Sequence, residues 1–455
     1  MAETMLIAGT MPFYLDIFVT FVHKTNITML EKKTRERIIA LIDKEVVPAI
    51  GCTEPMAVAL CTAKAATLLG KRPDRIKVLL SPNMLKNAMG VGIPGTGMIG
   101  LPIAVSLGAL IGKPEYGLEV LKDLTPDTLQ QGKSFMENAD IDIKIKQGIS
   151  EKLYIEVVCH AGKDQASAVI SGSHTHFVFA ERNNEVVLDE RSDKNDTEEE
   201  EDIQLSLRVV YDFAMTTPLD EIRFILKTKE YNMRAAEESI KGNYGHCLGK
   251  TMDRPLSHGI FGNNIFSHIL SRTASACDAR MGGAMIPVMS NSGSGNQGIC
   301  ATNPVVVYAM ENENTEEELI RALILSHLTA IYIKQSLGKL SALCGCVVAS
   351  TGSSCGITYL MGGDYQRICN SVKNMVANLT GMICDGAKPS CALKISSGVS
   401  TALLSALLSM EGKCVTSAEG IVDDDVDKCI HNLTSIGADA MRATDDMVLD
   451  IMTHK

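Results

Sequence analysis

Two cysteines, Cys384 and Cys391, bracket a loop that contains Gly386 and Pro389. The loop lies between two stretches with the apolar pattern of helices, residues 364–380 and 391–410, and its glycine and proline force a turn. Two thiols on one turn can point toward a common centre. They could bind a metal, form a disulfide, or lie there by chance.

A third thiol of interest is Cys52, in the turn 48–55 that opens onto a second predicted helix. Thr53 suits the N-cap of this helix, and Gly70 ends it. The dipole and the free N–H groups at a helix N-terminus favour the thiolate form of a cysteine. A buried, inert cysteine is the alternative, but the Gly and Thr neighbours favour a functional role.

Two glycine-rich loops could hold an anion. Residues 90–97 precede an apolar helix, but four glycines in eight residues more often only make a tight turn. Residues 289–298 carry Ser, Asn and Gln among small residues, so the backbone can approach a ligand and side chains can bond it. The second loop joins two apolar stretches and suits a carboxylate or phosphate. An undirected surface loop is the alternative.

The elements that must position these residues are mostly helical. Apolar spacing predicts helices over 31–47 and 53–70, a strand over 75–80, and helices from 204 onward, including 339–348. Between 141 and 188 the period changes to two, which predicts a small antiparallel sheet. The fold class is α+β: a mainly helical catalytic core with a smaller α/β region that carries an antiparallel sheet.

Four segments follow from this pattern: an N-terminal extension (1–28), a helical segment with Cys52 and the first Gly-rich loop (29–135), a β region with an acidic loop (136–203), and a helical domain (204–455). Within the β region, His174 and His176 share one face of a strand and could pair on a metal. No further ligand accompanies them at a typical spacing, so a substrate contact or a surface role is favoured.

Composition excludes several classes of protein. The net charge of -11 argues against nucleic acid or an anionic membrane as the partner. The apolar run 11–22 reaches only about one-third to two-thirds of a membrane span, includes Asp16, and lacks the basic flank of a signal peptide. We therefore expect a cytoplasmic protein with reduced thiols, in which most of the 14 cysteines are core residues.

Five motifs carry a resemblance to a known family: 45–55, Ser-Pro-Asn at 81–83 with Lys86-Asn87, 92–97, 292–298, and the loop 384–391. In this order they resemble the cysteine desulfidase family, also known as YhaM-type or UPF0597 proteins. That family is related to the alpha chain of bacterial iron–sulfur L-serine dehydratases. The resemblance runs from about residue 28 to the C-terminus.

The resemblance implies a [4Fe–4S] cluster with one open iron, held by Cys344, Cys384 and Cys391. Cys346 is the alternative to Cys344, and spacing does not decide between them. Cys52 matches the essential thiol near the open iron and could accept the α-proton of the substrate. The side chains expected to bind the substrate are those of Asn83, Lys86, Asn87, Ser292, Ser294 and Asn296.

The implied reaction is a β-elimination that converts L-cysteine to hydrogen sulfide, ammonia and pyruvate. L-Serine or another β-substituted amino acid is the alternative substrate. A pyridoxal-phosphate lyase would need a Schiff-base lysine, for which Lys86 and Lys394 are weak candidates. A non-catalytic iron–sulfur protein would have no use for Cys52. We expect a homodimer that acts on a small amino acid, without nucleic-acid or membrane partners.

Overall fold

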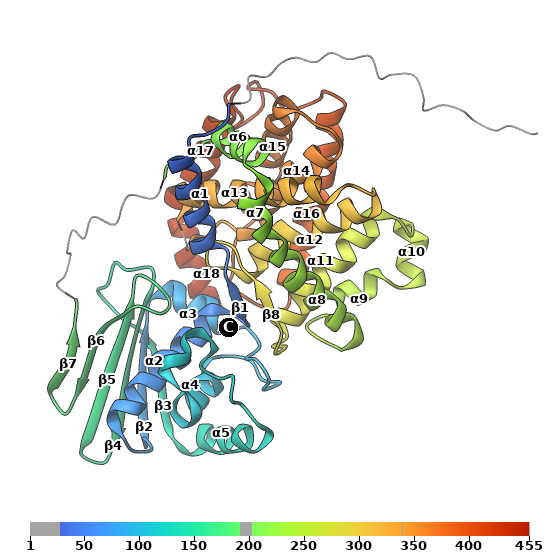
Figure 1. Cartoon of the computed structure of the whole chain (residues 1–455). Coiled ribbons are helices and arrows are strands. Elements are labelled where there is room, and N and C mark those ends of the chain that lie inside the picture. Colours follow the sequence, from blue (N-terminus) through green and yellow to red (C-terminus); the bar gives the residue numbers. More distant parts are fainter. Residues whose placement is uncertain (1–27, 192–202, 339, 455) are drawn as a thin grey trace, which may run out of the picture.

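The computed structural model describes residues 28–191, 203–338 and 340–454 (Figure 1). The predicted N-terminal extension lies outside these ranges except for Thr28, and so do residues 192–202 of the predicted acidic loop.

Helices and sheet occupy different parts of the molecule, which confirms the predicted α+β class (Figure 1). Most of the helices form one body, and the larger sheet lies below it in the view of Figure 1. The helices outside the sheet region are α1 (Lys32–Glu45), α6 (Leu207–Thr216), α7 (Leu219–Ile222), α8 (Leu226–Lys241), α9 (Leu248–Met252), α10 (Pro255–Phe261), α11 (Ile265–Met281), α12 (Gly295–Glu311), α13 (Glu316–Leu337), α14 (Gly345–Leu360), α15 (Tyr365–Leu379), α16 (Cys391–Met410), α17 (Val426–Ser435) and α18 (Arg442–His454).

The larger sheet has the strand order β3-β2-β4-β5-β6-β7. Its strands are β2 (Arg75–Leu80), β3 (Asp140–Ile145), β4 (Tyr154–Ala161), β5 (Asp164–Ser171), β6 (Phe177–Arg182) and β7 (Glu185–Asp189). Strands β4 to β7 are antiparallel, as predicted, but β3 runs parallel to β2, so the sheet is mixed. The parallel pair is possible because helices connect β2 to β3, and such a crossover returns the chain in the same direction.

This sheet takes strands from both sides of the predicted boundary at 135/136. Its core is built with α2 (Thr53–Leu69), which packs against β4, β5 and α4 (Leu101–Ile111). Buried Leu60, Ile76 and Val157 belong to this one core. The segments 29–135 and 136–203 therefore share a sheet and a core. The division of the chain into four separate domains stays a prediction.

A short antiparallel ribbon places the start of α2 beside the helical body. Strand β1 (Pro48–Ile50) pairs with β8 (Pro287–Met289), and the backbone N–H of Ser292 donates to the carbonyl of Glu45 over 2.9 Å. The ribbon thereby brings Cys52 next to the loop that follows β8, although about 240 residues separate them in sequence.

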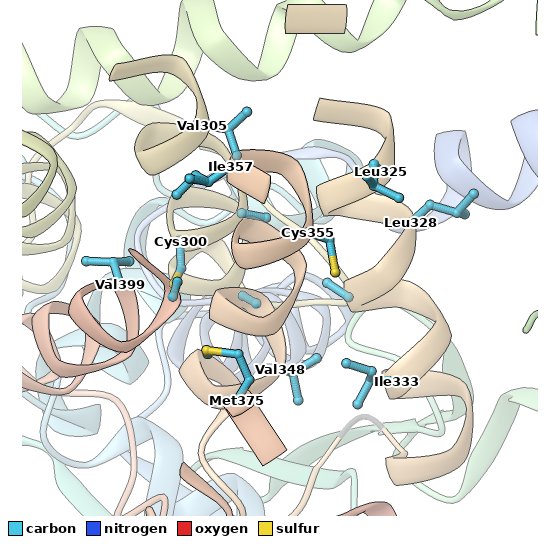
Figure 2. Packing of buried hydrophobic residues seen from close by; sticks show 14 of the residues in the cluster. Cys300, Val305, Leu325, Leu328, Ile333, Val348, Cys355, Ile357, Met375 and Val399 are labelled. Atoms are coloured by element: carbon cyan, nitrogen blue, oxygen red, sulfur yellow. The ribbon is translucent and has the colours of Figure 1, made fainter. Parts of the chain in front are cut away.

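The helical body has its own core, formed mainly by α12, α13, α14, α15 and α16 (Figure 2). Small residues let these helices approach closely: a Cβ at Gly352 of α14 would stand 2.2 Å from the carbonyl oxygen of Ser326 on α13. Cys300, Cys355 and Met375 are buried in this core, as expected for most of the cysteines (Figure 2).

The predicted helix over 339–348 begins too early, although its last four residues are helical. Residues 341–344 are not helical; Leu343 forms an isolated bridge with Ile383, and α14 begins at Gly345. The backbone N–H of Cys344 donates to the carbonyl of Met382 over 2.9 Å. Tertiary pairing thus overrides the helical pattern, and it joins the two cysteine-bearing segments.

Helix α16 is the one described helix that is long and apolar enough to cross a membrane, by length and composition only. Half of its most apolar window is buried within the protein, against α11, α14 and α15. A buried core helix can have the same length and apolar composition, so these features alone do not indicate a membrane span.

Candidate active site

One cavity of about 120 Å³ gathers most of the predicted site residues. Its size is close to that of an engineered cavity of about 150 Å³ that holds benzene. The predicted residues that line it are Cys52, Asn87, Ser292, Ser294, Asn296, Cys344, Cys384 and Cys391. Its other charged or titratable lining residues are Glu54, His174, Arg280, Lys334, Cys346 and Lys394.

The loop 384–391 is held in place by its glycine and by the neighbouring segment. Gly386 has a φ of 89°, and a Cβ there would stand 2.2 Å from the carbonyl oxygen of Lys86. The backbone N–H of Cys384 donates to the carbonyl of Ala342 over 2.6 Å, and Cys391 is the first residue of α16. Both thiols line the cavity.

Cys344 and Cys346 differ in their surroundings. Cys344 is the N-cap residue of α14, and its sulfur lies within hydrogen-bonding distance of the Cys346 sulfur, at 3.4 Å. This hydrogen bond lowers the pKa of Cys344, whereas the same contact and burial raise the pKa of Cys346. Cys346 also lies 3.1 Å from the sulfur of Met382. The contacts therefore favour Cys344 over Cys346 as a thiolate ligand.

Cys52, the N-cap residue of α2, is buried and its thiol donates to Glu54 Oε2 over 2.9 Å. The sequence predicted a thiolate here, but burial and the Glu54 carboxylate raise the pKa of Cys52 well above its usual value. The helix terminus does not outweigh these two effects, so the cysteine is a thiol that needs a proton acceptor to become a base.

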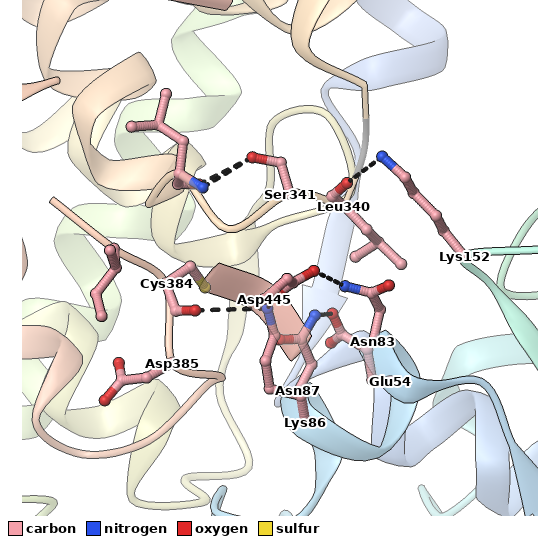
Figure 3. A network of polar contacts seen from close by, with 12 residues as sticks. Glu54, Asn83, Lys86, Asn87, Lys152, Leu340, Ser341, Cys384, Asp385 and Asp445 are labelled. Atoms are coloured by element: carbon pink, nitrogen blue, oxygen red, sulfur yellow. Dashed lines mark hydrogen bonds and ion pairs between the residues drawn. The ribbon is translucent and has the colours of Figure 1, made fainter. Parts of the chain in front are cut away.

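Glu54 accepts the hydrogen bond of this thiol, and the sequence pattern predicted no role for Glu54 beyond the first turn of a helix. It is buried and also accepts from Thr53 Oγ1 and from Asn87 Nδ2, over 3.1 Å and 3.2 Å (Figure 3). Burial opposes its ionisation, but the charge of His174 and the bond from Cys52 hold the pKa of Glu54 below its usual range. A Glu two residues after a helix-capping Cys was the available signal.

The glycine-rich loop 289–298 leads into the start of α12. Ser294 is the N-cap residue and accepts from the Gln297 N–H, while Ser292 adopts a φ of 48°. The Ser292 hydroxyl donates to Asn291 Oδ1 over 2.9 Å, and Asn291 Nδ2 in turn bonds the buried His327, 3.2 Å from its Nδ1 and 3.1 Å from its carbonyl. Such a left-handed conformation at a non-Gly residue is often found at ligand sites.

Asn83 and Lys86 lie elsewhere. Both bond to Asp445 of α18, and the ammonium of Lys86 also donates to the carbonyl of Cys384 over 3.4 Å (Figure 3). They line a neighbouring cavity rather than the thiol-lined one. The contact of these two residues with substrate stays a prediction; of the two, Lys86 contacts the Cys384 segment.

Three other predicted features also receive a place. His174 lines the cavity, whereas His176 is exposed and lies 3.4 Å from Glu190, so the two side chains have different surroundings. In the loop 90–97, Gly92 packs on the backbone of Gly283, where a Cβ would stand 2.8 Å away. This loop is a close-packed turn outside the cavity lining.

Comparison with known proteins agrees with the resemblance of the motifs. Residues 115–450 match the family model of the serine dehydratase alpha chain. A UPF0597 protein of Phocaeicola vulgatus is 68% identical over 428 residues, which cover 94% of this chain and 99% of that protein. Another, from Oleidesulfovibrio alaskensis, is 46% identical over 420 residues, 92% and 98% of the two chains.

The chain belongs to the UPF0597 family, which is serine dehydratase-like. The predicted family is thereby confirmed. Proteins of the serine dehydratase alpha-chain family are generally iron–sulfur dependent.

The donor set of the UPF0597 chain fits such a cluster. Within the described ranges, no three His, Cys, Asp or Glu side chains converge as ligands of a single metal ion. An iron–sulfur cluster is a multi-atom core held by Cys thiolates, and the thiols of Cys344, Cys384 and Cys391 all line the one cavity. Burial, together with the Cys344 and Cys384 sulfurs, raises the pKa of Cys391 to about 11, so the three thiols are within electrostatic reach of one another.

Proposed function

We propose that this chain is a [4Fe–4S]-dependent lyase that eliminates sulfide from L-cysteine and releases pyruvate and ammonia. Its family indicates a lyase-type enzyme. The observation that supports the proposal is one cavity lined both by the thiols of Cys344, Cys384 and Cys391 and by the hydrogen-bonded Cys52–Glu54 pair.

The three thiols would hold the cluster. When bound, a cluster with an open iron supplies Lewis-acid and thiophilic chemistry for a sulfur leaving group. The positive side chains of Lys334 and Lys394 line the same cavity and offset the negative charge of the thiolates.

The Cys52–Glu54 pair performs the proton transfer. Glu54 Oε2 takes the proton that Cys52 already directs toward it, and the Cys52 sulfur accepts the α-proton of the amino acid. The electron pair of the Cα–H bond then forms the Cα–Cβ double bond, and the Cβ–S bond breaks to release sulfide. The aminoacrylate that remains tautomerises and hydrolyses to pyruvate and ammonia.

L-Serine is the second candidate substrate, because the family model that matches this chain is that of the serine dehydratase alpha chain. The same residues would remove the α-proton, and hydroxide would leave in place of sulfide. A pyridoxal-phosphate mechanism is disfavoured by geometry: Lys86 pairs with Asp445 outside the cavity, and Lys394 pairs with Asp385. A cytoplasmic location suits an oxygen-sensitive cluster.

The test is anaerobic purification, iron and sulfide analysis, and pyruvate assays with L-cysteine, L-serine and other β-substituted amino acids. We expect Cys52→Ser to keep its iron and lose pyruvate formation, and Cys384→Ser or Cys391→Ser to lose iron. Full activity of Cys52→Ser would refute the proton transfer, and a normal iron content in either other variant would refute the ligand assignment.

A further inference from the structure

Several residues that line the cavity have a polar atom that is buried without a hydrogen-bond partner in the described part of the chain: Arg280 Nε, Asn87 Oδ1, Asn296 Oδ1 and Gln297 Oε1. Arg280 is 2% exposed and Gln297 is 3% exposed. Buried polar atoms in native proteins are nearly always bonded, so a group of them around one cavity indicates a polar ligand. One of the four is a cationic donor, and three are amide oxygens, which only accept.

The donor lies at the N-terminus of a long helix. Arg280, near the end of α11, packs on Gly295, the first residue of the 17-residue α12; a Cβ there would stand 2.2 Å from Arg280 Nε. The first N–H groups of a helix have no partner within it, and the helix dipole favours an anion there. A guanidinium at such a terminus forms a site for a carboxylate, which it can bind through two parallel bonds.

The acceptors suit a primary ammonium group, which has three N–H donors. The orientation of the Asn87 amide is set by its Nδ2, which donates to the Glu54 carboxylate over 3.2 Å, so its Oδ1 is left for a ligand. Arg280 acts electrostatically on both Cys52 and Glu54, which places the cation near the proton-transfer pair. A ligand held by both its carboxylate and its ammonium would present the carbon between them to Cys52 and Glu54.

We propose that Arg280 and the N-terminus of α12 bind the α-carboxylate of the substrate, and that the amide oxygens of Asn87, Asn296 and Gln297 receive its α-ammonium. The site thus selects free α-amino acids and rejects those with a blocked carboxylate or no ammonium. This inference rests on the proposed function, in that the thiol-lined cavity is taken as the substrate site.

Binding without turnover tests the proposal. L-Alanine has no β-leaving group, so the anaerobically purified full chain can be titrated with L-alanine, L-alaninamide and propionate by calorimetry. We expect the wild type to bind L-alanine roughly 10–100-fold more tightly than either analogue. Equal affinity for L-alanine and L-alaninamide would overturn the carboxylate assignment, and this comparison needs no variant.

Arg280→Met should weaken L-alanine binding roughly 10–100-fold and leave the affinity for L-alaninamide unchanged. Arg280→Lys, which retains the charge but not the planar fork, should bind L-alanine with intermediate affinity. Gln297→Met should weaken the binding of L-alanine but not that of propionate, because propionate has no ammonium group. Arg272→Met, on the same helix outside the cavity lining, is the matched control and should bind like the wild type. Unchanged L-alanine binding in Arg280→Met would refute the inference.

The two proposals fail separately. Arg280-dependent binding of L-alanine by a protein that forms no pyruvate would refute the lyase and leave the amino-acid site standing. Pyruvate formation with the same kcat/KM in wild type and Arg280→Met would refute the role of Arg280 and leave the lyase standing.

Discussion

The Cys52 thiol donates to Glu54 Oε2 over 2.9 Å at a buried position, and burial keeps that thiol protonated. A carboxylate that accepts a hydrogen bond from a thiol is placed to take its proton, whereas an isolated buried thiol has no acceptor within reach. At the scale of single residues, the chemistry therefore belongs to the pair and not to Cys52 alone.

Glu54→Gln should remove the acceptor and keep the shape of the side chain. We expect kcat to fall by about 10²–10⁴, the usual contribution of general acid–base catalysis, with the iron content unchanged. Pyruvate release and iron analysis measure the two effects. The exposed Glu36→Gln is the control. Near-normal turnover in Glu54→Gln would show that Cys52 uses another acceptor.

His327 should make stability depend on pH. It is fully buried, its Nε2 lies 2.9 Å from Thr302 Oγ1, and burial lowers its pKa from 6.5 to about 3. The unfolded chain therefore binds a proton more readily, so the free energy of unfolding falls on acidification below pH 6.5. From His327 alone we expect the free energy of unfolding to fall by about 2 kcal/mol between pH 7 and pH 5.

Urea unfolding at the two pH values measures this loss. His327→Gln should show a smaller loss, because glutamine does not titrate, and the exposed His431→Gln should behave like the wild type. An equal pH dependence in His327→Gln and wild type would assign the acid sensitivity to other groups.

At the scale of elements, two contacts position the loop 384–391. Gly386 has no room for a side chain, because a Cβ would stand 2.2 Å from a backbone oxygen. Gly412 has a similar positive φ, 69°, but open space around it. Comparing substitutions at these two glycines therefore separates the energetic cost of a left-handed conformation from that of a steric clash.

Gly412→Ala should lose about 1 kcal/mol of stability and keep its iron, since only the backbone conformation is unfavourable. Gly386→Ala should lose more, and it should also retain less iron because the loop must move away from Lys86. Thermal unfolding and iron content distinguish the two. A Gly386→Ala protein with normal iron would show that the loop tolerates the displacement.

The second contact is the ion pair between Lys86 of α3 (Pro82–Ala88) and Asp445 of α18. The Lys86 side chain is only 2% exposed. Removing one partner of a buried pair leaves a charge without compensation. We expect Asp445→Asn to cost about 3 kcal/mol and to reduce iron retention. The control is Asp439→Asn, which breaks the exposed pair with Arg442 and should cost less than about 1 kcal/mol. Equal stabilities of the two variants would contradict a positioning role for α18.

At the scale of the whole molecule, the site lies where two hydrophobic cores meet. Cys52 and Glu54 lie at the start of α2, a helix of the sheet region, and the Cys52 side chain packs into the core of the helical body, from which the other thiols and Arg280 come. Ligands that contact both sides should therefore stabilise both cores together.

The homodimer stays a prediction that belongs to this scale. Sedimentation velocity under anaerobic conditions should give about twice the chain mass of 49.0 kDa. A species of single-chain mass over a range of concentrations would contradict it.

The order of residues was enough to predict the class of fold and the family. Helix α16 begins at Cys391 and ends at Met410, where the apolar pattern places its ends, and α2 ends at Gly70 as predicted. These features depend on local periodicity, caps and residue identity, which the order of residues contains directly.

The tertiary structure alone decided which partner each side chain meets. Lys86 meets Asp445 over a separation of 359 residues, and Cys344 meets the segment before Cys384 where the pattern predicted a helix. Burial reverses the expected ionisation of Cys52, and the position of Arg280 against Gly295 has no signal in the spacing. Long-range packing and desolvation set these properties, and neither is encoded in local pattern.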